Sequence, residues 1–363
     1  MTSAKQLRPG DTIGILGGGQ LGRMLAISAA ELGLKCHIFC PDENSPAFEV
    51  ADKATIADYT DLHALDSFAA DCFAITYEFE NVPGETAERL AATSVVRPSA
   101  KALEIAQDRL SEKDFLSGSG IALASYQRID NQNDLENALI KNGGRGVLKT
   151  RRFGYDGKGQ VMIRSMTDAK TALEQLGHAP AVLEELVSFD REVSVIVARD
   201  VTGSSATYEL TENVHENHVL KTSTVPANVD QKVDVAAQAI AVKIADALDY
   251  IGVMGVEMFL VKTVGGDRLL VNEIAPRVHN SGHWTQDACL TSQFEQHIRA
   301  VAGWPLGSTK RHSNVIMHNL IGDDVTGYGN VLQEPNARLH LYGKAEARPG
   351  RKMGHVNRLS PRA

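Results

Sequence analysis

The chain has 363 residues, enough for two or three domains, and its 43% hydrophobic and 23% charged residues are typical of a soluble globular protein. No apolar run approaches the roughly 20 residues that a membrane-spanning helix requires, so we expect no membrane association. The formal net charge of −8 argues against a nucleic-acid binder, which would present a basic face.

The amino-terminus and the cysteines both indicate a cytoplasmic protein. Met1 to Lys5 leads directly into a polar segment and a strand, without the features of a secretory signal. Cys36, Cys40, Cys72 and Cys289 lack the CxxC spacing of a zinc or redox site. We therefore expect four reduced and mostly buried thiols, as in a reducing compartment.

The first hundred residues alternate strands and helices. The pattern predicts strands at 12–16, 36–40 and 74–79 and helices at 20–32 and 62–70. Such βαβ alternation predicts a doubly wound parallel sheet. We assign residues 1–105 to an amino-terminal Rossmann-like domain.

A different pattern begins near residue 100. One connecting helix is expected over residues 100–117, carrying Arg109 and Lys113. A small α+β unit follows, with strands at 147–150 and 181–185. We assign the linker helix and this lid domain to residues 106–190.

The remaining chain predicts longer strands of antiparallel character, at 193–198, 253–261 and 269–274. A helix is expected over residues 284–302, before a mixed tail. We assign residues 191–363 to a carboxy-terminal mixed α/β domain.

An early glycine loop offers a first functional hypothesis. Gly17, Gly19 and Gly22 satisfy GxGxxG between a strand and a helix, and Asp42 lies about 20 residues further on. The pattern favours an anion bound at the helix N-terminus, although glycines also allow a close turn without a ligand. An NAD-dependent dehydrogenase is therefore one alternative, supported by this loop alone.

The segment RRFGYDGKGQ, residues 151–160, is the most unusual in the chain. Three glycines within six residues give an open loop, and Lys158 can place its charge on a phosphate. Lys149 ends the preceding strand, where apolar neighbours would bury its stem. An exposed hairpin tip is the alternative, but the interleaved glycines, aromatic, acid and base favour phosphate binding.

A second segment, residues 181–187, is a strand that ends in Glu184 and Glu185. Its backbone could pair with an adenine edge, and Glu192 at the head of the next strand could hold ribose hydroxyls. Two acids in a row are otherwise typical of a solvated strand edge.

Two further carboxylates indicate a metal. With period-two alternation and a turn at Gly265-Gly266, Glu257 falls opposite or diagonal to Glu273. Like charges in this arrangement are destabilising unless a cation lies between them, and magnesium takes carboxylate oxygens together with substrate phosphates. The alternative is one acid exposed at a strand end. Asn272 points to the other strand face unless the strand ends there.

Directly after these strands, Arg277, His279 and Asn280 place a guanidinium, an imidazole and an amide beside the predicted metal site. Such groups suit an oxyanion that becomes phosphorylated. Without Arg277 and Asn280 beside it, His279 would be interpreted as a structural histidine.

The chain resembles the ATP-grasp superfamily in a set of features and in their order along the sequence. These are Lys149, the FGYDGKGQ loop, Glu184-Glu185, Glu257 and Asn272-Glu273. More closely, the chain is similar to the N5-carboxyaminoimidazole ribonucleotide synthetases, purine-pathway enzymes that carboxylate aminoimidazole ribonucleotide. The similarity covers nearly the whole chain, through GILGGGQLGRM, TYEFENV, QDRLSEK, KTRRFGYDGKGQ, NEIAPRVHNSGHWT and HLYGKAEARPGRKMGH.

The resemblance implies an ATP-grasp fold and a magnesium-dependent ligase that is a cytoplasmic homodimer. Bicarbonate would attack ATP, and the resulting carboxyphosphate, or CO₂ released from it, would be captured by the amine of aminoimidazole ribonucleotide. The implied ATP-binding residues are Arg109, Lys149, Gly154, Tyr155, Asp156, Gly157, Lys158, Gly159, Gln160, Glu184, Glu185, Leu186, Val187, Glu192, His215, Asn272 and Glu273.

The resemblance also implies the other roles. Glu257 and Glu273 would hold magnesium. The implied catalytic residues are Asp156, Lys158, Arg277 and His279, with Asp156 orienting or deprotonating the amine. The implied substrate contacts are Gln20, Glu78, Tyr155, Asp156, Lys158, Lys344 and Arg351.

The basic tail supports a phosphorylated substrate. Lys344, Arg348, Arg351 and Lys352 lie within nine residues, around a turn at Pro349-Gly350. A solvated basic face is the common alternative, but a ribonucleotide carries a 5′-phosphate that needs such a pocket. Two other functions stay open: a formate-using glycinamide ribonucleotide transformylase, and a nucleotide sensor without activity.

Overall fold

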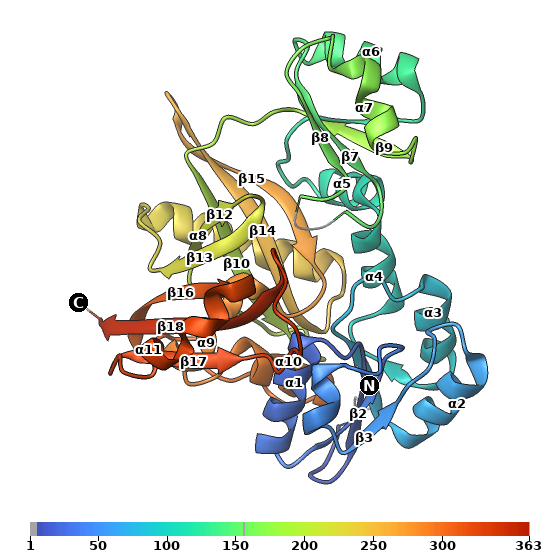
Figure 1. Cartoon of the computed structure of the whole chain (residues 1–363), viewed down its shortest axis with the longest axis vertical. Coiled ribbons are helices and arrows are strands. Elements are labelled where there is room, and N and C mark those ends of the chain that lie inside the picture. The colour runs from blue at the N-terminus through green and yellow to red at the C-terminus, as the bar shows by residue number, and fades with distance from the viewer. Residues whose placement is uncertain (1–5, 155–156, 363) are drawn as a thin grey trace.

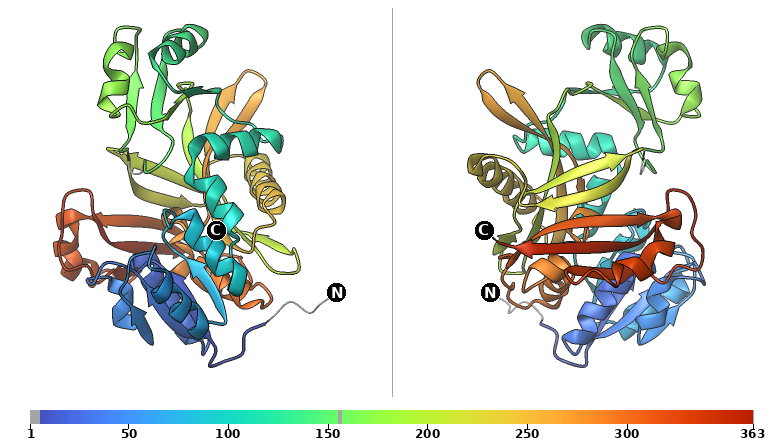
Figure 2. Two further views of the ribbon diagram at one scale, coloured as in Figure 1. Left: turned by 90° about the vertical axis from the view of Figure 1, so that its right-hand side faces the viewer. Right: turned by 60° about the vertical axis from the view of Figure 1, so that its left-hand side comes forward.

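The computed structural model describes residues 6–154 and 157–362, and these residues form three β-sheets (Figure 1). The strand orders are β3-β2-β1-β4-β5, β6-β9-β7-β8 and β15-β14-β10-β12-β13-β16-β18-β17, with β11 beside β10 in the last sheet. Figure 2 shows that the small sheet stands apart from the other two.

The amino-terminal sheet is parallel throughout, as predicted. Its apolar strands are covered on both faces, by α1 on one side and by α2 and α3 on the other. Its elements are β1 (Thr12–Leu16), α1 (Gln20–Glu31), β2 (Lys35–Phe39), η1 (Pro46–Val50), β3 (Lys53–Thr55), α2 (Leu62–Asp71), β4 (Ala74–Tyr77), α3 (Gly84–Thr93) and β5 (Val95–Val96).

The small unit is an antiparallel sheet with two helices, at the top of Figure 1. Its core, which includes Leu135, Leu139, Leu148 and Leu173, is a hydrophobic cluster of its own. A separate core allows this lid to move as one body. Its elements are β6 (Tyr126–Ile129), α6 (Gln132–Lys141), β7 (Gly146–Thr150), β8 (Gln160–Ile163), α7 (Ala169–Gln175) and β9 (Ala181–Glu184).

The large sheet is antiparallel, and α8 and α10 both pack against β10. The helix α10 also packs on α1, so the amino-terminal and carboxy-terminal parts share one core. The elements are β10 (Arg191–Arg199), β11 (Ser205–Thr207), β12 (Thr211–Glu216), β13 (Val219–Val225), α8 (Gln231–Ala247), β14 (Gly252–Thr263), β15 (Gly266–Ala275), η2 (Asn280–Gly282), α9 (Thr285–Ala288), α10 (Gln293–Ala302), β16 (Ser313–Ile321), η3 (Gly322–Gly327), α11 (Tyr328–Val331), β17 (Ala337–Leu341) and β18 (Lys352–Pro361).

Two long helices were predicted wrongly. The connecting segment is broken into α4 (Ala100–Gln107) and α5 (Arg109–Gly118), because Asp108 caps α5 by accepting from the N–H groups of Leu110 and Ser111. The segment over 284–302 is likewise divided into α9 and α10, and Ser292 caps α10. In both places a capping side chain ended a helix that apolar spacing alone would have continued.

The cysteines behave as predicted. All four are free thiols; Cys36, Cys40 and Cys289 are buried and Cys72 is half-buried. Across residues 6–154 and 157–362, every helix falls short of the length and apolar character needed to cross a bilayer.

Candidate active site

The two glutamates predicted to face each other do so. In the β14–β15 hairpin, Glu257 is register-paired with Glu273, and a bulge follows this pair. Arg109 Nη1 lies 2.9 Å from Glu273 Oε2, and His279 Nε2 lies 2.9 Å from Glu257 Oε1. Each carboxylate therefore has a nitrogen partner of its own, which reduces the repulsion between them.

The charge of Glu273 is held by its neighbours. Burial alone would raise its pKa, but Arg109 and Lys149 lower the pKa to about 2. The adjacent Asn272 Oδ1 is buried without a hydrogen-bond partner among the described residues. The ionised Glu273, with Glu257 opposite it and an unpaired amide oxygen beside it, fits magnesium, which prefers oxygen ligands.

No group of three or more His, Cys, Asp or Glu side chains converges for a metal anywhere in the described chain. Two carboxylates alone are a normal protein contribution to magnesium, which usually completes its shell with water and substrate phosphates. The residues present thus fit a cation that is held jointly with a nucleotide.

Three cations surround one buried acid next to this pair. Glu184, at the end of β9, accepts from Lys149 Nζ at 2.8 Å and pairs with Lys113 Nζ at 3.2 Å. Burial lowers the pKa of Lys149, as do Arg109 and Lys113, whereas Glu184 raises it. Arg109, Lys113 and Lys149 converge in an acidic protein, which makes this the place where phosphates would be bound.

The predicted phosphate loop requires its glycines. Gly159 has φ +70°, and a Cβ there would lie 2.5 Å from Thr150 Oγ1. A Cβ on Gly157 would lie 2.5 Å from the His218 side chain, so the loop closely approaches the β12–β13 hairpin. Gln160 Nε2 also lies 3.3 Å from His218 Nδ1.

Two residues of this loop, Tyr155 and Asp156, were predicted to belong to the site and lie outside the described residues. Gly154 lines the cavity described below, whereas the Lys158 side chain is exposed at the surface.

The predicted adenine and ribose contacts lie beyond Glu184. The backbone N–H of Glu185 already donates to Ser125 O, and Leu186 is 40% exposed. Val187 is half-buried. Glu192 Oε2 lies 2.5 Å from His215 Nδ1, on the neighbouring strands β10 and β12.

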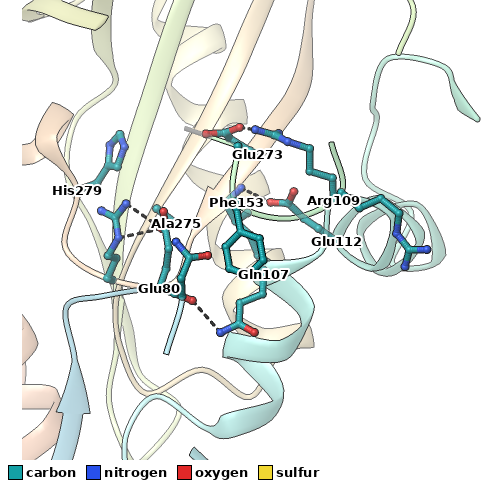
Figure 3. A pocket seen from close by; sticks show the side chains of 14 residues that line it. Glu80, Gln107, Arg109, Glu112, Phe153, Glu273, Ala275 and His279 are labelled. Carbon is teal, nitrogen blue, oxygen red and sulfur yellow. Dashed lines mark hydrogen bonds and ion pairs between the residues drawn. The ribbon is translucent and has the colours of Figure 1, made fainter. Parts of the chain in front are cut away.

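A cavity joins Glu273 to the loop after β7 and to the segment that follows β4 (Figure 3). Arg277 contributes its guanidinium, with Nε 2.9 Å and Nη2 2.8 Å from Glu80 Oε2. Phe153 has φ +62° and is 71% exposed. The lining residues include Glu80, Gln107, Arg109, Glu112, Arg151, Phe153, Gly154, Glu273, Arg277 and His279.

Glu112 adds a protonated acid to this wall. It is 2% exposed, and its Oε1 accepts from Ile274 N at 2.6 Å. Burial and the charge of Glu273 raise the pKa of Glu112 to about 8. At neutral pH the side chain is mostly uncharged, which spares the site a third negative charge.

The amino-terminal glycine loop binds a carboxyl group of the chain itself. Glu78 Oε1 accepts from the Gly19 N–H at 2.7 Å, at the start of α1. Burial raises the pKa of Glu78, whereas Gly19, Arg277 and Lys344 lower it. Asp42 is exposed in a turn, where it accepts from Asn44 N. The dinucleotide interpretation therefore loses its geometric support.

Lys344 thus brings the basic tail to the amino-terminal loop. Its Nζ donates to Lys352 O at 2.8 Å and lies 5.7 Å from the Tyr342 ring centre. Arg351 Nη1 donates to Glu346 O at 3.0 Å. Gly350 has φ +77° in the predicted turn. Gln20, the first residue of α1, is half-buried beside Gly19.

Family comparisons agree with this arrangement. Three family models match: a ribonucleotide synthetase preATP-grasp domain at residues 11–107, an ATP-grasp domain at 114–294, and a phosphoribosylaminoimidazole carboxylase C-terminal domain at 315–363. The N5-carboxyaminoimidazole ribonucleotide synthase of Brucella melitensis is 55% identical, over 98% of each chain. That of Bacillus subtilis is 44% identical, over 98% of this chain and 93% of its own.

The chain belongs to the N5-carboxyaminoimidazole ribonucleotide synthase family. The crystal structure of an ADP complex of such a synthetase superposes with a TM-score of 0.95 at 43% identity, covering 99% of this chain and 94% of that one. The Aspergillus clavatus synthase in complex with ADP and 5-aminoimidazole ribonucleotide superposes with a TM-score of 0.91 at 33% identity, covering 97% and 94%. The predicted ATP-grasp fold is confirmed.

Several residues of this synthase-family site were not predicted. Lys113 was placed on its helix without a role, although its spacing of four from Arg109 puts both on one helix face. Glu80, Gln107, Glu112 and Phe153 lie within the quoted motifs TYEFENV, QDRLSEK and KTRRFGYDGKGQ, but no role was assigned to them. Only the folding of separate segments around one cavity reveals them.

Proposed function

We propose that this chain joins bicarbonate to 5-aminoimidazole ribonucleotide at the expense of ATP, giving N5-carboxyaminoimidazole ribonucleotide, ADP and phosphate in purine biosynthesis. The observation that carries the proposal is a cluster of cations beside the Glu257–Glu273 pair, at a cavity lined by Arg109 and Arg277: Lys113 and Lys149 pair with Glu184, and Arg109 pairs with Glu273. The Aspergillus clavatus relative, with ADP and 5-aminoimidazole ribonucleotide, supports the same substrates.

ATP would lie between the lid and the large sheet. Arg109 and Lys149 would contact its phosphates beneath the loop from Gly154 to Gln160. The segment from Glu184 to Val187 would pair with adenine, and the Glu192–His215 pair would meet the ribose. Glu184 supports this use of Lys149 because it holds the ammonium at 2.8 Å in a buried site.

Magnesium would be held by Glu257 and Glu273, with Asn272 close to the phosphates. When bound, it would neutralise negative charge on the transferred phosphoryl group. The unpaired buried oxygen of Asn272 and the ionised state of Glu273 support this assignment.

The reaction would have two steps. A bicarbonate oxygen attacks the γ-phosphorus, the bond to the bridging oxygen breaks, and ADP leaves; Lys149 and Arg277 stabilise the developing charge. The exocyclic amine of the ribonucleotide then attacks the carboxyl carbon of carboxyphosphate, and phosphate leaves. The amine proton passes to a base, for which Asp156 is the proposed group, assisted by Lys158.

The ribonucleotide would lie between the amino-terminal loop and the tail. Gln20, Glu78 and Tyr155 would contact it, and Lys344 and Arg351 would bind its 5′-phosphate. The closeness of Lys344 to Glu78 supports a common pocket, because it places a positive charge of the tail beside the amino-terminal loop.

Closure of the lid would protect carboxyphosphate from water. The separate lid core supports a rigid-body motion. We propose domains at 1–105, 106–190 and 191–363, each of which contains one of the three sheets. We further propose a homodimer that functions in the cytoplasm without membrane or nucleic acid; light scattering after size exclusion tests the dimer.

ADP release, with each substrate omitted in turn, tests the function. Release should require both bicarbonate and 5-aminoimidazole ribonucleotide. Release with formate and glycinamide ribonucleotide instead would support the transformylase alternative. ATP binding without any turnover would support the nucleotide sensor, and NADH binding without ATP affinity would support a dehydrogenase.

A further inference from the structure

A chain of buried polar side chains runs across the large sheet and ends at His279. Ser223 Oγ donates to Asn213 Oδ1 at 2.8 Å, Asn213 Nδ2 to Ser194 Oγ at 2.8 Å, and Ser194 Oγ to Ser281 Oγ at 2.7 Å. Ser281 Oγ lies 2.9 Å from His279 Nδ1. Each bond links neighbouring elements, from β13 through β12 and β10 to η2.

These side chains are withdrawn from water. The exposed fraction is 0% for Ser194 and Ser223, 1% for Ser281 and 6% for Asn213. Ser194 interrupts an apolar strand, between Val193 and Val195. Small polar residues in such a place need partners, and here the partners form one continuous series.

The last link decides which imidazole nitrogen carries the proton. The backbone N–H of Ser281 points at His279 Nδ1, with the two nitrogens 3.3 Å apart. A backbone N–H can only donate, so Nδ1 is the accepting nitrogen. The proton is then on Nε2, which lies 2.9 Å from Glu257 Oε1.

The opposite tautomer would place two acceptors against each other. With the proton on Nδ1, the lone pair of His279 Nε2 would face a carboxylate oxygen of Glu257, and Ser281 N–H would face a ring N–H. The Nε2–H form instead donates to Glu257 Oε1 and leaves the other carboxylate oxygen for a cation. Polar partners of this kind typically orient carboxylates that bind metals.

The backbone of His279 is fixed as well. Gln293, fully buried, accepts from His279 N at 2.9 Å and donates to His279 O at 2.7 Å. A Cβ on Gly255 would lie 2.7 Å from His279 Cβ, so the residue lies directly on β14. With the main chain of His279 held, rotation of its ring is the remaining freedom, and the Ser281 hydroxyl at the end of the serine–asparagine chain contacts that ring.

We propose that Ser223, Asn213, Ser194 and Ser281 form a positioning chain that holds the ring of His279, in the Nε2–H tautomer set by the Ser281 backbone N–H, and thereby orients Glu257. The role in metal binding rests on the proposed function; the tautomer itself does not. In this scheme Ser281 and Ser194 are positioning residues, because they act only through His279.

The tautomer is tested directly in the wild-type chain. In a two-bond proton–nitrogen correlation spectrum of protein labelled with ¹⁵N-histidine, the signals lost in His279→Gln identify His279. We expect an unprotonated Nδ1 and a protonated Nε2, without metal or substrate. An Nδ1–H form, or two tautomers in exchange, would overturn the proposal whether or not the serine variants fold.

The coupling to Glu257 is tested with Ser281→Ala and Ser194→Ala. Both should leave Nδ1 of His279 unprotonated, because the Ser281 backbone N–H is kept, and should weaken Mn²⁺ binding in the presence of ADP by about 10-fold, measured by electron paramagnetic resonance of free Mn²⁺. Thr76→Val is the matched control, since Thr76 Oγ1 bonds another buried imidazole, His297 Nε2, at 2.8 Å. This control should lose thermal stability while Mn²⁺ affinity stays within about 2-fold.

Two results separate the possibilities. If Ser281→Ala loses only stability, as the control does, the chain is structural and the proposal is overturned. If the wild-type chain binds no Mn²⁺ with ADP, the proposed metal site fails, and the wild-type spectrum still decides whether His279 is fixed on Glu257.

Discussion

At the scale of single residues, the metal assignment depends on the charge of Glu273. Arg109 and Lys149 lower the pKa of this half-buried carboxylate to about 2, which keeps it ionised at physiological pH. We predict that Glu273→Gln, which keeps the shape and removes the charge, lowers the rate of ADP release by about 100-fold or more, since a lost ligand should cost at least as much as a lost supporting partner. Coupled spectrophotometric detection of ADP at saturating ATP measures the effect.

The matched control is Glu174→Gln, which changes an exposed glutamate on α7 in the lid. Its rate should equal that of the wild type. If Glu273→Gln retains full turnover, Glu273 does not bind the metal.

Glu112 makes a second prediction, on stability. Its pKa is raised from an ordinary 4.5 to about 8, so the folded state holds a proton that the unfolded state releases. The stabilising effect of that proton is complete below pH 4.5 and is lost as pH rises toward 8. Glu112→Gln imitates the protonated form, so its advantage over the wild type should grow with pH.

We expect the melting temperature of Glu112→Gln, relative to wild type, to rise between pH 5.5 and pH 8.5. The shift corresponds to a change on the order of 3 kcal/mol in the free energy of unfolding, at 1.36 kcal/mol per pKa unit. Differential scanning fluorimetry in EDTA measures it. A difference that is constant with pH would show that Glu112 is already ionised in the folded chain.

Residue-level prediction from sequence succeeded where the signal was local. The facing of Glu257 and Glu273 follows from strand alternation and one turn, and the structure confirms it. Lys113 and Glu112 could not be assigned in this way. Their roles arise from contacts with Glu184 and with the backbone of Ile274, which lie far along the chain.

At the scale of elements, the break between α4 and α5 shows what apolar spacing omits. The prediction of one helix over 100–117 failed because Asp108 prefers to cap a helix rather than continue one. The break has a consequence for the site. Asp108 also pairs with Arg151 at 2.7 Å, which ties the start of α5, and with it Arg109, to the lid loop.

The glycine loop provides the element-level prediction. Gly159 has a left-handed backbone and no room for a Cβ, so Gly159→Ala meets both strain and a collision with Thr150. Strain alone costs roughly 1–2 kcal/mol. We predict that the KM for ATP rises by about 10-fold or more, since 1.4 kcal/mol corresponds to a factor of ten. Initial rates at varied ATP measure it.

Gly177→Ala separates the collision from the strain. Gly177 also has a left-handed backbone, at φ +63°, but a Cβ there would meet nothing within 4 Å, and the residue follows α7, away from the loop. This variant should lose lid stability and keep the wild-type KM for ATP. An equal rise in KM in both variants would mean that lid stability, rather than the loop, controls ATP binding.

At the scale of the whole molecule, the site joins segments that no local pattern connects. The glycine loop at the start of α1 was predicted to bind an anion, and its Gly19 N–H donates to the carboxyl group of Glu78. The tail was predicted to bind phosphate from its charges alone. Lys344 lies close enough to Glu78 to lower the pKa of its carboxyl group, although more than 260 residues of chain separate the two. This closeness follows from the packing of the parallel sheet and the antiparallel sheet through α1 and α10.

This juxtaposition gives the last prediction. If Lys344 binds the 5′-phosphate, Lys344→Ala removes a charge-assisted contact worth about 1.5–3 kcal/mol, so the KM for 5-aminoimidazole ribonucleotide should rise by roughly 10- to 150-fold. The KM for ATP should stay unchanged, because the ATP phosphates would contact Arg109 and Lys149 instead. Lys310→Ala, at an exposed lysine of the same part of the chain, should alter neither constant. A rise in the KM for ATP alone would place Lys344 at the nucleotide and leave the ribonucleotide phosphate without its proposed partner.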